Sequence, residues 1–428
     1  MIQLHDVHSL HSIDWESKKD GAYVRDSFLP FFQKGITAFI ENVNTQLFLL
    51  EVDDLILPVT LNNAEFENSY VCSPYTHYIS YALEELWELK KPWLEKLLTY
   101  PIHLMGNWLR RTNINKVIVV NNWMLSTNLY HSINEQQIEQ ITKVLVEKFP
   151  EHTILFRSLN NKLYPATTEA LSTVGYNKIM SRSIYLFDPK HYKKMNRKKR
   201  KDLLNDKSLL EKSNYEIITN EELTKDDILQ ISQLYNQLYI EKYSAHNPMF
   251  TPAYLWNALQ HRLFEIKAIK KGDTIDGVIA YFIRDGVMTT PILGYHTNSD
   301  QQQGLYRILS LLITMDSIEK DLICHCSAGA GEFKRNRGAT QQIEYSYVYN
   351  AHLPPSQQKV WKVLMWILNT YIEPMAKNIA FKQKDCYDCL LPETIYLSVA
   401  AIPTLWSLYS IFLIIYFICI VWMKERSV

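Results

Sequence analysis

GYHTNSDQQQGLYRILSLLITMDSIEKDLICHCSAGAGEFKRNRG, residues 294–338, is the stretch of this sequence that decides its fold. Its polar loop leads from a strand into a helix at 304–321, where apolar residues recur at helical spacing. The short apolar run 322–326 is typical of a buried strand, and the small residues after it lead into a short helix that Gly338 ends. This alternation of strands and helices predicts an α/β module.

The same order of elements occurs twice along the chain. The first series is strand 116–124, helix 132–149, strand 153–159, helix 167–174 and strand 181–187. The second series is strand 289–297, helix 304–320, strand 322–326, helix 331–337 and strand 343–349. A duplicated module explains the recurrence, and the alternative is chance repetition of a common α/β pattern. The predicted fold class is therefore α/β, with mixed α+β sheets in two tandem modules and a C-terminal transmembrane helix.

Local signals predict where several elements begin and end. Ser132 has the position of a helix N-cap, with Glu135 at the capping-box position. The helical pattern of 78–111 contains Pro101, which predicts a break there. Residues 264–297 predict three strands joined by two turns.

The composition is that of a folded protein, with 47% hydrophobic and 21% charged residues among 428. At about 100–200 residues per domain, this length predicts two domains. Because 45 basic side chains balance 45 acidic ones, the overall charge does not point to nucleic acid. The cysteines are sparse, and Cys386-x-x-Cys389 lacks the second pair that a tetrahedral zinc site needs, so we expect no disulfide framework and no metal site.

The C-terminal residues 397–423 carry no charged side chain. Spanning a bilayer takes about 20 apolar residues, so this segment predicts a transmembrane helix, and the alternative is a buried core helix. The start of the sequence does not resemble a signal peptide. We therefore expect a single-pass C-terminal anchor in the cell inner membrane, in contact with membrane lipid, with the folded domains in the cytoplasm.

Several blocks of the sequence resemble a known protein family. LYNQLYIEKYSAHNPMFT (234–251), GYHTNSDQQQGLYRIL (294–309) and SAGAGEFKRNRG (327–338) are similar to a bacterial family of GNAT-type N-acetyltransferases, over roughly residues 110–365. That family is related to two-module acyltransferases that include the Fem-type peptidoglycan aminoacyl-transferases. The resemblance implies transfer of an acyl group from acyl-CoA, acetyl-CoA in the first instance, to an amine or hydroxyl by direct attack. Acyl-CoA is then a co-substrate, with no permanently bound cofactor.

The resemblance also assigns segments to the chain. The expected division is an N-terminal degenerate GNAT-like module at 1–188, a basic linker and helix at 189–212, a catalytic module at 213–375, a linker at 376–396 and the membrane helix at 397–423. The first module is expected to be structural or to help bind the acceptor, because Ser126-Thr127-Asn128, not a glycine-rich loop, follows its strand.

The CoA-binding signature of GNAT proteins, Gln/Arg-x-x-Gly-x-Gly/Ala, is matched in part. Gln301 and Gly304 fit it, whereas Tyr306 stands where a small residue is expected. The residues that the resemblance assigns to cofactor binding are Gln301, Gln303, Gly304, Leu305, Arg307, Ser327 and Gly329. A helix N-terminus supplies free N–H groups and positive potential to a pyrophosphate.

Other residues are assigned to chemistry and to the acceptor. An amine needs a base and the leaving thiolate needs an acid, often a tyrosine, so the catalytic candidates are Glu332, Tyr306 and Tyr345. The candidates for acceptor binding are Tyr239, Lys242, Tyr243 and Asn247, with a structural helix as the alternative. His325 is expected to be a core histidine more often than a catalytic one. Glu344 is expected to pair with Lys334, Arg335 or Arg337, and Cys324 and Cys326 are expected on opposite sides of their strand.

The basic run at 190–201 leaves three readings open: a solvated linker helix, contact with anionic lipid, or contact with tRNA, in that order. Two alternatives to a CoA-dependent enzyme remain open. One is a Fem-like transferase that uses aminoacyl-tRNA at the membrane, and the other is a non-catalytic, membrane-tethered binding protein. The acceptor is expected to be a small molecule or a cell-envelope component, and nucleic acid is expected only under the Fem-like alternative.

Overall fold

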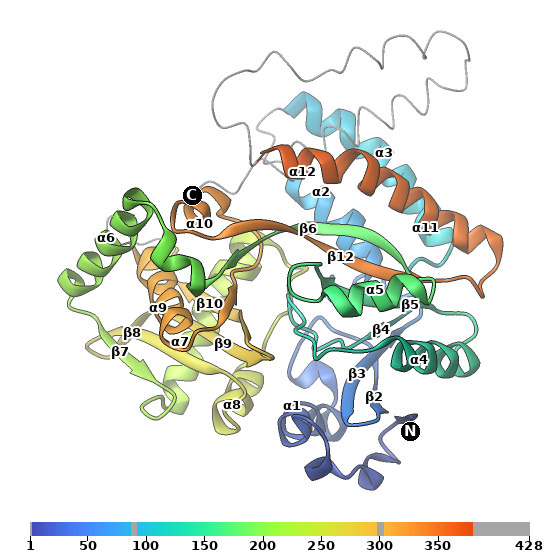
Figure 1. Ribbon diagram of the computed structural model, residues 1–428, viewed down its shortest axis with the longest axis horizontal. Helices are drawn as coiled ribbons and strands as arrows, with labels where there is room; N and C mark the ends of the chain where they lie inside the picture. Colours follow the sequence, from blue (N-terminus) through green and yellow to red (C-terminus); the bar gives the residue numbers. More distant parts are fainter. Residues whose placement is uncertain (1, 87–91, 298–303, 380–428) are drawn as a thin grey trace.

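The strands form one mixed sheet that runs through both halves of the molecule (Figure 1). The structure is a computed structural model that describes residues 2–86, 92–297 and 304–379. In these residues the order of the strands in the sheet is β1-β2-β3-β4-β5-β12-β6-β11-β10-β9-β8-β7. Its neighbouring strands are antiparallel except β4 with β5 and β10 with β11.

The two halves contain the predicted repeat. The first half holds β1 (Ile2–His5), α1 (Gly21–Lys34), β2 (Gln46–Val52), β3 (Leu55–Asn62), the π-helix η4 (Thr76–Ser80), α2 (Tyr81–Glu85), α3 (Pro92–Arg111), β4 (Val117–Val120), α4 (Glu135–Lys148), β5 (Thr153–Leu159), α5 (Pro165–Thr173) and β6 (Asn177–Phe187). The second half holds α6 (Arg197–Ser213), β7 (Glu216–Thr219), α7 (Lys225–Tyr235), the π-helix η7 (Asn236–Tyr243), α8 (Pro252–Gln260), β8 (Glu265–Lys271), β9 (Thr274–Arg284), β10 (Val287–Tyr295), α9 (Leu305–Glu319), β11 (Ile323–His325), α10 (Gly331–Asn336), β12 (Thr340–Tyr349), α11 (Pro355–Ile367) and α12 (Glu373–Ile379). The series β4-α4-β5-α5-β6 and β10-α9-β11-α10-β12 confirm the order read from the sequence.

The last strand of each series lies in the other half of the sheet. β12 lies between β5 and β6, and β6 lies between β12 and β11. Figure 1 shows these two long strands crossing the middle of the molecule side by side. The segment boundaries that we predicted stay a prediction, but the hydrogen bonds of the sheet do not stop at residue 188.

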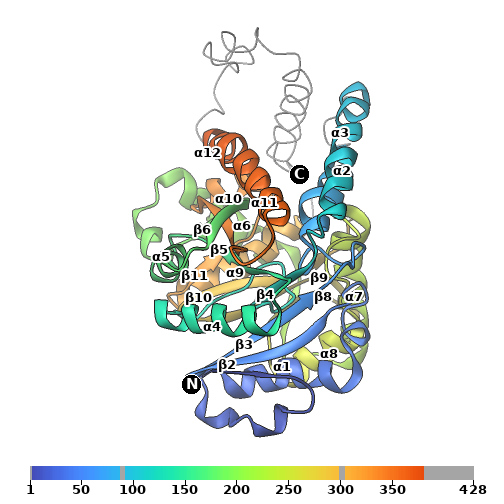
Figure 2. The ribbon, with the colours of Figure 1, turned by 90° about the vertical axis from the view of Figure 1, so that its right-hand side faces the viewer.

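Helices cover both faces of the sheet. Successive residues of β4 show this, because Ile118 and Val120 pack with α4 and α5, whereas Val117 and Val119 pack with α3 and α11. Figure 2 shows α4 and α5 on one side of the sheet and α3, α7 and α8 on the other. Because successive side chains of β4 face two different layers of helices, this strand is apolar and buried along its whole length.

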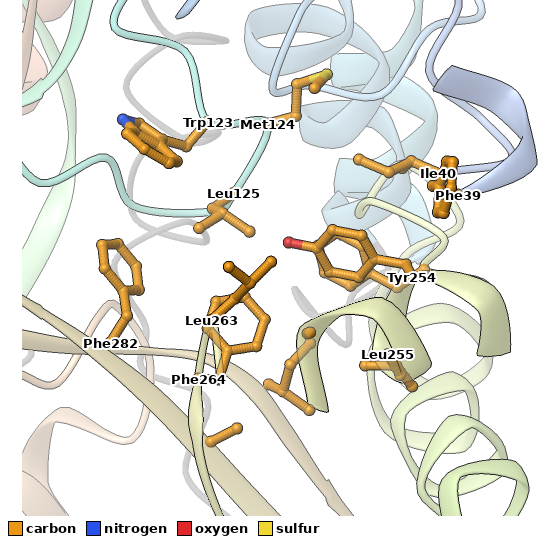
Figure 3. Close-up of a cluster of buried hydrophobic side chains, with 14 of the residues drawn as sticks. Phe39, Ile40, Trp123, Met124, Leu125, Tyr254, Leu255, Leu263, Phe264 and Phe282 are labelled. Atoms are coloured by element: carbon orange, nitrogen blue, oxygen red, sulfur yellow. The ribbon is translucent and has the colours of Figure 1, made fainter. Parts of the chain in front are cut away.

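One hydrophobic core joins the halves. Figure 3 shows Trp123 and Leu125, from the loop after β4, in the same buried cluster as Tyr254, Phe264 and Phe282 from the second half. Each large apolar side chain that is fully buried contributes about 1.5–3 kcal/mol. The halves are therefore expected to unfold together.

Two local predictions are wrong, each for a physical reason. The N-cap of α4 lies two residues later than predicted, because Asn134 exchanges capping-box hydrogen bonds with Gln137 in place of Ser132 and Glu135. Pro101 does not break the helix but lies within α3. Its ring removes one backbone donor, and packing of the apolar face of α3 on the core outweighs that loss.

The predicted membrane helix at 397–423 lies outside the described residues. Among the residues that the structure does describe, every helix is too short or too polar to cross a bilayer.

Candidate functional site

The parallel strands β10 and β11 part after three residues. Val287 to Thr289 pair with Ile323 to His325, after which β10 continues along β9 to Tyr295 through an irregularity between Thr289 and Ile292. On the other side, the backbone of Cys326 and Ser327 hydrogen-bonds to Tyr185 of β6. We call this divergence, residues 290–295 and 326–329, the β10/β11 fork.

Aromatic side chains surround the fork. The ring of Tyr306, in the first turn of α9, lies 6.2 Å from that of Tyr295 and 4.9 Å from that of Phe333. Tyr243 of η7 hydrogen-bonds to Tyr295. Burial raises the pKa of Tyr306, with a hydrogen bond to Ser310 acting against it, so its hydroxyl is protonated at neutral pH. The structure thus brings together Tyr306 and Tyr243, which the sequence assigned to catalysis and to the acceptor.

The start of α9 is tightly packed. Gly304 is its N-cap and has the left-handed conformation, with φ 60°. A Cβ at this position would lie 2.5 Å from Cδ2 of Leu209 on α6, so a larger residue here would be strained and would push the end of that leucine side chain aside. Leu305 is buried in the core. Gln301 and Gln303 lie outside the described residues.

An acidic residue of α6 pairs with the arginine predicted to bind cofactor. Nε of Arg307 donates to Oδ1 of Asp206 at 2.7 Å, and Nη2 of Arg337 donates to the same oxygen at 3.0 Å. The Asp206 side chain is fully buried, whereas 41% of the Arg307 side chain is exposed. The two arginines and one aspartate leave one net positive charge beside α9.

The turn after β11 bears the other predicted cofactor residues. Ser327 and Gly329 have φ of 60° and 76°. The backbone N–H of Ser327 donates to Nδ1 of His325 at 3.2 Å, and Nζ of Lys334 donates to the carbonyls of Cys326 and Ala328 at 2.6 and 2.8 Å. These bonds fix the turn from both sides. Glu332, in the first turn of α10 that follows, is exposed.

Cys324 and Cys326 do not face opposite sides, which corrects the sequence prediction. Their sulfur atoms are 3.6 Å apart. The reason is that β11 ends at His325, so Cys326 no longer follows the alternation of a strand. The hydrogen-bonding contact between the two thiols lowers the pKa of Cys326, with burial acting against it, and the same contact together with burial raises the pKa of Cys324.

The remaining predicted residues lie in two other places. Tyr345 packs in the core of the first half and donates its hydroxyl hydrogen to Oε1 of Glu373 on α12 at 2.7 Å. Asn247 is buried and donates from Nδ2 to the carbonyl of Tyr239 at 2.9 Å, which shapes the loop after η7. The Lys242 ammonium lies 5.9 Å from the centre of the Tyr243 ring. The structure therefore does not bring Tyr345 together with Tyr306.

The sequence analysis missed a buried ionic group below the fork. Nε of Arg182 on β6 donates to Oε1 of Glu344 on β12 at 2.8 Å, and Nε2 of His325 lies 3.5 Å from Oε2 of the same carboxylate. Burial raises the pKa of Glu344, but the charge of Arg182 and the nearby His325 outweigh burial and hold this pKa at about 2. Glu344 therefore does not pair with Lys334, Arg335 or Arg337, because β6 inserts Arg182 next to it. A charged residue inside each of two apolar strands was the available signal.

In the first half, the parallel strands that correspond to β10 and β11 are β4 and β5, and side chains of the protein itself fill the space beyond them. Beyond β4, the Asn122 amide donates to Oγ1 of Thr60 at 2.8 Å and to the carbonyl of Val71 at 3.0 Å, while the Tyr130 hydroxyl donates to the carbonyl of Arg157 at 2.6 Å. The capping box of α4 already uses free N–H groups at that helix start. By contrast, Gly304 has no side chain with which to cap α9.

No protein-family model matches the chain. No curated protein matches it in sequence. Among solved structures, a conserved protein of unknown function from Bacteroides thetaiotaomicron has 10% identity and a TM-score of 0.46, over 82% of this chain and 100% of that one. L-PGS from Bacillus licheniformis has 12% identity and a TM-score of 0.41, over 54% and 78%. A tandem GNAT protein from the clavulanic acid biosynthesis pathway has 7% identity and a TM-score of 0.38, over 83% and 99%. These similarities are distant and assign the chain to no family.

Proposed function

We propose that the chain is an acyltransferase that moves an acyl group from acyl-CoA to an amine or hydroxyl of an acceptor. The observation that supports this proposal is the β10/β11 fork with α9 beginning next to it. Parted strand edges present backbone N–H and C=O groups to an extended arm that contains amides, as the pantetheine arm does. The N-terminus of α9 and the net positive charge of the Arg307–Asp206–Arg337 group suit its pyrophosphate.

The chemistry is direct attack. The acceptor amine or hydroxyl forms a bond to the thioester carbonyl carbon, the carbon–sulfur bond breaks, and CoA leaves as a thiolate. Tyr306, which is protonated at neutral pH, donates a proton to that thiolate. Glu332, exposed at the start of α10, accepts the proton of the acceptor directly or through water. Because Tyr345 is bonded to Glu373, the proposal gives the role of acid to Tyr306 alone.

Binding is the first test. We expect acetyl-CoA and longer acyl-CoAs to bind the full chain in isothermal titration, and Gly304→Ala to weaken binding at least tenfold because its Cβ displaces Leu209. The matched control is Gly272→Ala, which introduces the same left-handed strain, φ 62°, with nothing within 4 Å of the new Cβ. Absence of binding of every acyl-CoA to the unmodified chain would overturn the proposal.

Turnover is the second test, and it separates chemistry from binding. We expect Tyr306→Phe and Glu332→Gln each to lower kcat by about 10²–10⁴, the usual contribution of general acid–base catalysis, with little change in acyl-CoA affinity. The measurement is release of free CoA thiol with a panel of amines. If both variants bind acyl-CoA and turn over like the unmodified chain, the assignments of Tyr306 and Glu332 are wrong and other groups carry the proton transfers.

One observation favours a second candidate, the transfer of an aminoacyl group from tRNA. α6 begins with a basic run whose Arg197, Lys198, Arg200 and Lys201 are exposed. Such a cluster binds phosphates without reading sequence. Filter binding of bulk tRNA to the full chain, compared with a variant that has these four residues changed to glutamine, tests this candidate. Equal retention by both would remove it.

A further inference from the structure

A second site of interest is a small cavity whose lining includes no residue of the fork. It lies between the strands β4, β5 and β12 on one side and the segment 70–78 and α11 on the other. Its volume, including the open space at its mouth, is about 290 Å³. The enclosed part has room for one or two waters, or for the terminal oxyanion of a ligand whose remainder lies at the mouth.

Arg157 of β5 lines this cavity, and the groups that accept hydrogen bonds from its guanidinium are neutral. Its Nη1 donates to the carbonyl of Val71 at 2.9 Å and to Oδ1 of Asn122 at 3.4 Å. Its guanidinium carbon lies 5.7 Å from the centre of the Tyr70 ring. Among the described residues, no carboxylate lies within ion-pair distance of Arg157.

The other arginines of the interior do have acidic partners. Arg182 pairs with Glu344 at 2.8 Å, and Arg284 pairs with Asp20 at 3.2 Å. Arg157 is partly buried, and a charge that is partly withdrawn from water is stabilised by a counter-charge. The cavity next to Arg157 is therefore the place where a counter-charge is missing.

The rest of the lining complements an anion. The pKa of His77 is lowered to about 3 by burial and by the charges of Arg157 and Arg182, so its ring is neutral at physiological pH. Burial raises the pKa of Tyr78, so its hydroxyl, which hydrogen-bonds to Ser346, stays protonated and brings no negative charge to the cavity. The cavity thus combines one cation with neutral polar groups under a positive potential.

We propose that this cavity binds an oxyanion, a carboxylate or a phosphate, of a small ligand, with Arg157 as its counter-charge. Arg157 is well suited to this because its guanidinium has five N–H donors, and the two bonds above use only Nη1. The inference concerns binding alone and stands apart from the proposed acyl transfer, so it is tested without acyl-CoA.

The test uses sodium acetate and inorganic phosphate as probes, at constant ionic strength set with chloride. We expect at least one of them to bind the full chain in isothermal titration, and Arg157→Gln, which keeps a donor for Val71, to weaken that binding at least tenfold. The control is Arg262→Gln, which removes an exposed arginine that pairs with Glu221. Binding of acetate alone identifies a carboxylate ligand, and binding of phosphate alone identifies a phosphate ligand. No binding of either probe, or equal binding to Arg157→Gln, overturns the proposal.

A second measurement uses the unmodified chain and therefore needs no variant. An anion beside Arg157 offsets the positive potential at His77, so it raises the pKa of this imidazole. We expect the ring resonances of His77 to move on addition of the bound probe, while those of the exposed His8 and His11 stay in place. If His77 moves no more than the two exposed histidines, the anion does not occupy the cavity.

Discussion

Arg182 and Glu344 stand opposite each other on β6 and β12, the two strands that the halves of the chain exchange. Their ion pair is nearly closed to solvent, with 12% of the arginine side chain and 3% of the glutamate side chain exposed. The guanidinium also donates to the carbonyl of Ser126 at 2.7 Å. The pair therefore joins strands from both repeats to the loop after β4.

We expect Glu344→Gln to lower the free energy of unfolding by about 3–5 kcal/mol, because it leaves the Arg182 charge buried without a partner. Equilibrium unfolding in urea measures the change. The matched control is Glu221→Gln, which breaks the exposed pair with Arg262 and should cost no more than about 1 kcal/mol. A loss in Glu344→Gln no larger than in the control would show that the buried pair contributes little.

The sequence predicted the elements of the two repeats because their apolar periodicity and turn residues are local signals. It could not predict that β12 lies between β5 and β6, since strand pairing across about 160–190 residues has no local signature. The partner of Glu344 was missed for the same reason, as Arg182 reaches it only through that exchange. At the fork, the sequence located Tyr306 and Gly304 through the motif, but the pairing of Arg307 with Asp206 depends on how α6 packs.

The shared core predicts one cooperative unfolding transition. Phe282 of β9 is 3% exposed, and its ring is stacked on that of Tyr23 of α1 at 6.5 Å. We expect Phe282→Ala to cost about 3–5 kcal/mol and to shift the whole transition. Tryptophan fluorescence and far-ultraviolet circular dichroism should give the same midpoint.

The control for this prediction is Leu229→Ala on α7, where 47% of the side chain is exposed. It should change the free energy of unfolding by about 0.5 kcal/mol or less. Two separate transitions in Phe282→Ala, one of them at the position of the unmodified chain, would contradict the view that the halves share a core.

Asp20 makes the stability depend on pH. It accepts a hydrogen bond from His131 at 2.8 Å and another from Arg284 at 3.2 Å. The bond from His131 and the charge of Arg284 lower the pKa of Asp20 to about 2, with burial acting against them. Because this folded-state pKa lies below the usual value of about 3.9, the stabilisation is present above pH 4 and is lost as the pH falls towards 2.

We therefore expect Asp20→Asn to be less stable than the unmodified chain at pH 7. The difference should be about 1 kcal/mol, since 38% of the Asp20 side chain is exposed and solvent screens it. Urea unfolding at pH 7, 4 and 3 should show the difference shrinking below pH 4. The exposed Asp273→Asn is the control, and a difference that stays constant across this range would refute the assignment.

The two cysteines at the fork should differ in reactivity although their sulfurs are 3.6 Å apart. Cys326 is partly exposed and its contact with the Cys324 thiol lowers its pKa, whereas Cys324 is buried and its pKa is raised. Since the thiolate is the nucleophile, we expect iodoacetamide to alkylate Cys326 at least about tenfold faster than Cys324 in the folded chain. Peptide mapping after brief labelling measures both rates.

Cys326→Ser provides the decisive comparison. It removes the reactive thiol and leaves Cys324 buried against α9, so labelling of the peptide that contains both positions should fall to the rate of the buried Cys72. Cys72→Ser should leave the labelling of that peptide unchanged. Alkylation of Cys324 as fast as Cys326 in the unmodified chain would show that β11 opens on the timescale of the reaction. The turn after β11 would then not be held fixed by the hydrogen bonds of Lys334 and His325.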